Sequence, residues 1–169
     1  MFASIYGRTI PKCGSQDEVG QAPLIDLAFT FSPLVELTTV DTVVLDVAGQ
    51  DLLFGSPANP KPSVDGLAVD HNATINSARA LASEIVRRAT QLGFKVNVSV
   101  AANPDAAIHA ARSFKGVTVI PAGQESLQLG NLPLKMLDYS LAGIEKEKVT
   151  EISETLELWG LRTFSDFAG

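Results

Sequence analysis

The chain of 169 residues has the size of one domain, and 46% of its residues are hydrophobic, which is enough to bury a solid core. Its net charge of −6 argues against strong autonomous binding of nucleic acid, because domains that grip phosphates by themselves usually present a basic surface. One cysteine and two histidines exclude a disulfide framework and a Cys/His zinc site.

The N-terminal segment predicts a strand, a loop and a helix. FASIY (2–6) has the composition of a short strand. The polar, glycine-containing stretch 11–21 predicts a loop, and PLIDLAFTF (23–31) predicts a short apolar helix. No secretory leader is evident, and no apolar run approaches the roughly 20 residues of a membrane span. We therefore expect a cytoplasmic protein.

The next segment predicts a β-hairpin. Its two arms, LVEL (34–37) and DTVVLDV (41–47), are rich in apolar and β-branched residues, which favour strands. A turn at 38–39 joins the arms. Residues 55–66 contain three prolines and two glycines, so they predict a loop.

Two helix–strand pairs follow the hairpin. Apolar residues recur at helical spacing over 75–92, and KVNVSVA (95–101) alternates as a half-buried strand does. Asn103 is placed to cap a second, alanine-rich helix that runs to about Phe114. VTVI (117–120) predicts the last strand.

The C-terminal residues are predicted to be helical. LPLKML (132–137) starts one turn, 145–159 makes a longer helix, and Gly160 ends it before a short helix capped by Thr163. The whole order predicts an α+β, ferredoxin-like fold. We expect a mixed, mostly antiparallel sheet with helices on one face, followed by a C-terminal helical extension.

Three stretches in this order resemble the Y-family translesion DNA polymerases. VELTTVDTVVLDVAG (35–49) is similar to the family's strand with Ser-Ile-Asp-Glu-x-x-Leu-Asp. VNVSVAANPDAAIHAARSFKGVTVI (96–120) is similar to its alanine-rich helix and the strand after it. LPLKML (132–137) with LELWGLRTFSDFA (156–168) resembles the start of its thumb. The sequence around the hairpin resembles the ImuB-like homologues of bacterial mutagenesis cassettes more than the catalytic members of the family.

The resemblance implies two segments and a metal-dependent chemistry to look for. Residues 1–130 would be a palm-like domain with the fingers subdomain deleted, because only residues 7–22 are left for it. Residues 131–169 would be a partial thumb-like helical segment. In catalytic members, two divalent ions about 3.5–4 Å apart are held by clustered carboxylates. One carboxylate comes from the first strand, and an adjacent Asp-Glu pair comes from the hairpin.

This chain carries one of those three carboxylates. Asp41 matches the Asp of the pair and is the candidate metal ligand, whereas Thr42 stands in place of the Glu. The first-strand position falls near Tyr6 or Gly7, neither of which is a ligand for a hard cation. Asp46 matches a downstream family Asp, but in a regular strand it would point away from Asp41. We interpret both aspartates as vestigial, structural or turn-capping residues, with residual metal binding as the alternative; no cofactor is expected.

Three other residues are candidates for contact with a nucleotide or DNA. Lys115 corresponds to the lysine of a family phosphate-binding turn, although a lysine at a helix end is also an ordinary surface residue. Gly160 and Arg162 lie in the thumb-like turn, where backbone N–H groups can hold phosphates. Trp159 and Leu161 are expected to pack inside the protein.

Three functional hypotheses follow. The first is a non-catalytic, ImuB-like homologue that acts as an accessory or scaffold in translesion DNA repair. Its implied partners are a RecA-like accessory protein and an error-prone replicative-type polymerase, with weak DNA contact and self-association also expected. The second is an active nucleotidyltransferase, a fragment of an error-prone DNA polymerase, that holds Mg²⁺ with help from Asp17, Glu18 or Asp65. The third is a protein-interaction module without DNA contact.

Overall fold

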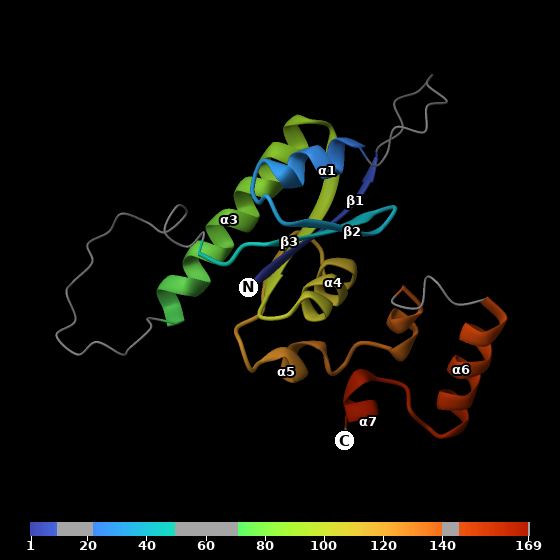
Figure 1. Cartoon of the computed structure of the whole chain (residues 1–169). Coiled ribbons are helices and arrows are strands. Elements are labelled where there is room, and N and C mark those ends of the chain that lie inside the picture. Colours follow the sequence, from blue (N-terminus) through green and yellow to red (C-terminus); the bar gives the residue numbers. More distant parts are fainter. Residues whose placement is uncertain (10–21, 50–70, 140–145, 169) are drawn as a thin grey trace. The chain divides into compact units, whose positions relative to one another are not determined.

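The structure is a computed structural model that describes residues 1–9, 22–49, 71–139 and 146–168. Its internal contacts divide the chain into unit 1, Met1–Pro121, and unit 2, Ala122–Gly169 (Figure 1). The sequence places this border at 130 instead. The difference arises because residues 125–129 form a short helix that packs within unit 2.

Unit 1 is built on a five-stranded sheet of order β2-β3-β1-β4-β5. Neighbouring strands are antiparallel, except that β5 runs parallel to β4. The first four strands and the helices between them have the βαββαβ order of a ferredoxin-like fold, and this confirms the α+β prediction. The strands are β1 (Phe2–Thr9), β2 (Val35–Thr39), β3 (Thr42–Asp46), β4 (Phe94–Ala101) and β5 (Val117–Val119).

Helices cover both faces of the sheet. On one face, α1 (Ala22–Phe29) and α3 (His71–Gln91) pack on apolar side chains that alternate along the strands (Figure 1). The buried strand residues of this core are Ala3, Ile5, Val43, Leu45, Phe94, Val96, Val98 and Val100. On the other face lies α4 (Pro104–Ser113). The prediction that all helices share one face is therefore wrong for α4.

The position of α4 follows from its small side chains. Ala106, Ala107, Ala110 and Ala111 are buried, so the helix backbone approaches the sheet closely. Ser99 of β4 donates a hydrogen bond to the carbonyl of Ala107. This strand residue alternates with Val98 and Val100, which face the opposite core.

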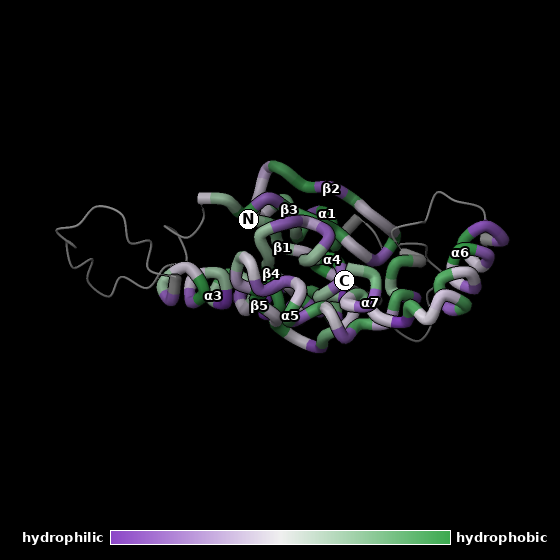
Figure 2. Tube along the Cα trace, turned by 90° about the horizontal axis from the view of Figure 1, so that it is seen from below, coloured by the Kyte–Doolittle hydropathy of each residue, from purple (hydrophilic) through white to green (hydrophobic). Residues whose placement is uncertain are grey.

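Unit 2 is helical. It contains α5 (Glu125–Leu129), the 3₁₀ helix η1 (Leu134–Tyr139), α6 (Lys146–Leu158) and α7 (Phe164–Ala168). A small antiparallel bridge joins Pro133 to Thr163, so the chain before η1 lies beside the chain before α7. Apolar and polar residues alternate along α6 as they do along α3 (Figure 2). Among the described helices of both units, none is long and apolar enough to cross a lipid bilayer.

Candidate functional site

The candidate site lies where the last turn of α4 meets the β2–β3 hairpin. The start of α4 is fixed by its N-cap, because the Asn103 side chain accepts a hydrogen bond of 2.8 Å from the amide of Ala106. Near its end, Asn97 of β4 donates to the carbonyl of Ala111 at 3.1 Å. The same Asn97 accepts from the amide of Gly116 at 3.0 Å, so α4 is held to β4 on both sides of its C-terminus.

Arg112, on the last turn of α4, reaches the hairpin. Its Nη2 lies 2.6 Å from Asp41 Oδ1, 2.6 Å from Thr39 Oγ1 and 2.7 Å from Thr42 Oγ1. Both threonine hydroxyls in turn donate to Asp41 Oδ1, at 2.8 Å and 3.0 Å. The guanidinium carbon also sits 5.1 Å from the centre of the Tyr6 ring, a cation–π distance.

The Arg112–Asp41 ion pair is mostly shielded from water. The Arg112 side chain is 3% exposed and the Asp41 side chain 24% exposed. A charge at that depth is tolerated only when it is paired and hydrogen-bonded, as it is here. The Arg112 guanidinium therefore lies against the Asp41 carboxylate at the hairpin turn, and the formal charge of the pair is zero.

His109, one turn before Arg112, is also buried on α4. Burial lowers the pKa of His109 below its ordinary value of 6.5, and the Arg112 charge lowers it further, while Asp105 opposes the shift. The lowered pKa favours the neutral imidazole beside the charged guanidinium.

The position on β1 that faces Arg112 is Tyr6. Tyr6 pairs with Thr42 across the strands, on the side of the sheet covered by α4. A Cβ added to Gly7 would instead point toward the opposite core, 2.8 Å from Val96 Cγ1 and 3.5 Å from Leu24 Cδ1. An aromatic ring therefore stands where the resemblance leads one to seek a carboxylate.

Asp46 lies at the other end of β3. Its Oδ1 accepts from the amide of Ala48 at 2.9 Å and lies 3.9 Å from the amino group of Met1. The prediction that Asp41 and Asp46 point to opposite faces of one strand does not apply, because Asp41 lies in the turn before β3. Asp46 lies on the same face of β3 as Thr42, but it is four positions further along the strand, a distance of about 13 Å. The structure does not bring the two aspartates together.

The described residues offer no cluster for a metal ion. No group of three or more His, Cys, Asp or Glu side chains converges in the parts of the chain that the structure covers. Asp17, Glu18 and Asp65, the additional ligands of the active hypothesis, lie outside those residues. A single carboxylate already bound to a guanidinium is a poor site for a hard divalent cation.

The remaining candidates are Lys115, three residues after Arg112, and Gly160 and Arg162 in unit 2. Lys115 is exposed in the connection between α4 and β5. In unit 2, the amide of Gly160 donates to the carbonyl of Glu157 at 3.0 Å. The amide of Arg162 donates to Asp166 Oδ2 at 3.0 Å, and this bond is the first of several that lower the pKa of Asp166.

The backbone amides of the turn before α7 are thus hydrogen-bonded within the turn itself. Asp166 Oδ2 also accepts from the amide of Thr163 at 2.9 Å, and the Thr163 hydroxyl accepts from the amide of Asp166 at 3.3 Å. This reciprocal pattern is a capping box. The backbone donors of Arg162 and Thr163 are therefore bound to a carboxylate of the same chain.

Sequence reasoning missed Arg112. An arginine in the last turn of a helix is also what the helix dipole favours on an exposed surface, so its position gave no distinct signal. The useful hint is its place directly after the buried alanines of α4. Because a guanidinium stays charged when it is buried, an arginine at this position needs an acid or other hydrogen-bond acceptors nearby.

Comparisons with known proteins add a structural likeness. No family model matches the chain, and no match is found among curated proteins. Among solved structures, the chain is similar to a DinB family error prone DNA polymerase from Sulfolobus solfataricus, with a TM-score of 0.48 and 21% sequence identity. The likeness covers 83% of this chain and 35% of that polymerase, so the chain spans about a third of its length.

Proposed function

We propose that the chain is a palm-like homologue of the Y-family DNA polymerases, of the ImuB-like kind, that does not catalyse nucleotidyl transfer. It acts as an accessory or scaffold protein in translesion DNA repair. The observation that carries the proposal is the Arg112–Asp41 ion pair. It stands at the hairpin where the sequence motifs place the catalytic Asp-Glu pair of the family.

Electrostatics explains why this site is unsuited to two-metal catalysis. A divalent cation about 4 Å from the guanidinium would be repelled by about 8 kcal/mol at an effective dielectric constant of about 20. Asp41 supplies an attraction of similar size, so the two cancel. Little then remains to offset the cost of removing water from Mg²⁺, which catalytic sites supply through several carboxylates.

The catalytic part of the proposal is tested by primer extension. The protein is incubated with primer–template DNA, deoxynucleoside triphosphates and Mg²⁺ or Mn²⁺, beside an active Y-family polymerase. We expect no extended product, and no saturable rise in melting temperature when metal and nucleotide are titrated together. Extension that Asp41→Ala abolishes would establish the active alternative instead.

The accessory part is tested by direct binding. A purified RecA-like accessory protein and an error-prone replicative-type polymerase are titrated against the chain by biolayer interferometry. Saturable binding to at least one of them is expected. If neither binds, the assignment to this repair complex is wrong, whatever the outcome of primer extension.

An interaction module without DNA contact remains the second candidate, and the charge of unit 2 favours it. Residues 122–169 contain eight Asp or Glu and four Lys or Arg, a net charge of −4. DNA affinity depends mainly on cationic groups that neutralise phosphates. Fluorescence anisotropy with primer–template DNA at low ionic strength separates the two, since the accessory role with DNA contact predicts binding that salt weakens.

A further inference from the structure

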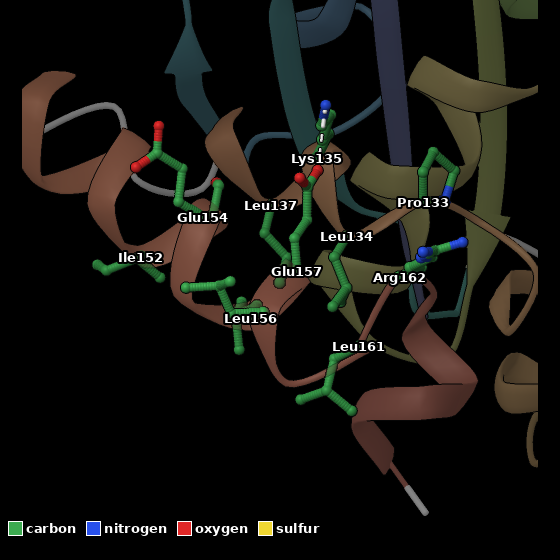
Figure 3. A pocket seen from close by; sticks show the side chains of 12 residues that line it. Pro133, Leu134, Lys135, Leu137, Ile152, Glu154, Leu156, Glu157, Leu161 and Arg162 are labelled. Atoms are coloured by element: carbon green, nitrogen blue, oxygen red, sulfur yellow. Dashed lines mark ion pairs between the residues drawn. The ribbon is translucent and has the colours of Figure 1, made fainter.

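We draw no further inference here: the strongest candidate, the apolar groove of about 840 Å³ between η1 and α6 of unit 2 (Figure 3), has lining charges that cancel, with Lys135 and Arg162 set against Glu154 and Glu157, and nothing in the structure shows what covers it.

Discussion

Neutralising either member of the Arg112–Asp41 pair is expected to destabilise unit 1, but by unequal amounts. Asp41→Asn keeps the shape of the side chain and leaves the guanidinium, 3% exposed, without its counter-ion. Arg112→Met leaves Asp41, which is 24% exposed and can be partly hydrated. A buried charge deprived of its partner costs about 3–5 kcal/mol, whereas losing a hydrogen bond to a charged group costs about 1.5–3 kcal/mol.

The magnitudes follow from these exposures. In Asp41→Asn, the amide oxygen of the new side chain and the hydroxyls of Thr39 and Thr42 still accept hydrogen bonds from the guanidinium, which reduces the first cost. We therefore expect about 3 kcal/mol for Asp41→Asn and about 2 kcal/mol for Arg112→Met. The double variant has no uncompensated charge and is expected to lose about 2 kcal/mol. The coupling free energy between the two positions is then about 3 kcal/mol.

The assay is urea unfolding followed by far-ultraviolet circular dichroism, with the midpoint and slope compared among the variants. Trp159 is the only tryptophan and lies in unit 2, so circular dichroism rather than tryptophan fluorescence is used to follow unit 1. Glu84→Gln serves as a control. Glu84 pairs with Arg87 and Arg88, whose side chains are 56% and 42% exposed, so its loss leaves no buried cation and is expected to matter much less. Additive single effects, or a cost below about 0.5 kcal/mol for Arg112→Met, would refute the argument from burial.

Three further outcomes are expected. Burial lowers the pKa of His109, so the unfolded chain binds protons more readily than the folded chain below about pH 6.5. The contribution of His109 to stability is therefore complete above that pH and is lost as the pH falls. His109→Gln should flatten this part of the pH dependence of the urea midpoint, and an unchanged dependence would refute the reasoning. Gly7→Ala should cost about 1–2 kcal/mol by crowding Val96, and Val96→Ala should relieve that cost in the double variant. Asp166→Ala should speed amide exchange at the start of α7 while Asp166→Asn does so less; unchanged protection would show that the capping box contributes nothing.

Much of the fold could be predicted from local patterns. The alternation of Val96, Val98 and Val100 marked β4, and the two apolar arms around 38–39 marked the hairpin, because these periods directly reflect which side is buried. β1 runs to Thr9, beyond the predicted end at Tyr6, since Gly7 to Thr9 pair with the start of β4 despite having no apolar pattern. Pairing with a distant strand leaves no local signal.

The site was only half visible in the sequence. That Asp41 has no second acid beside it in the hairpin could be predicted, because this needs only a comparison of sequence positions. That Arg112 lies beside Asp41 could not be predicted, since the two residues are 71 positions apart and no pattern tells which side of α4 meets the hairpin. Likewise, the sequence predicted the helix α6, but helical spacing does not reveal whether another surface covers Trp159, which is 73% exposed. The prediction that Trp159 packs inside the protein is therefore wrong.

The buried guanidinium on α4 also limits how this protein can change over time. If Arg112 were lost first, Asp41 would remain as a carboxylate without a counter-ion. If Asp41 were lost first, Arg112 would remain as a buried cation without a counter-ion, so either route passes through a less stable intermediate. Related chains are therefore expected to vary at Arg112 and Asp41 together.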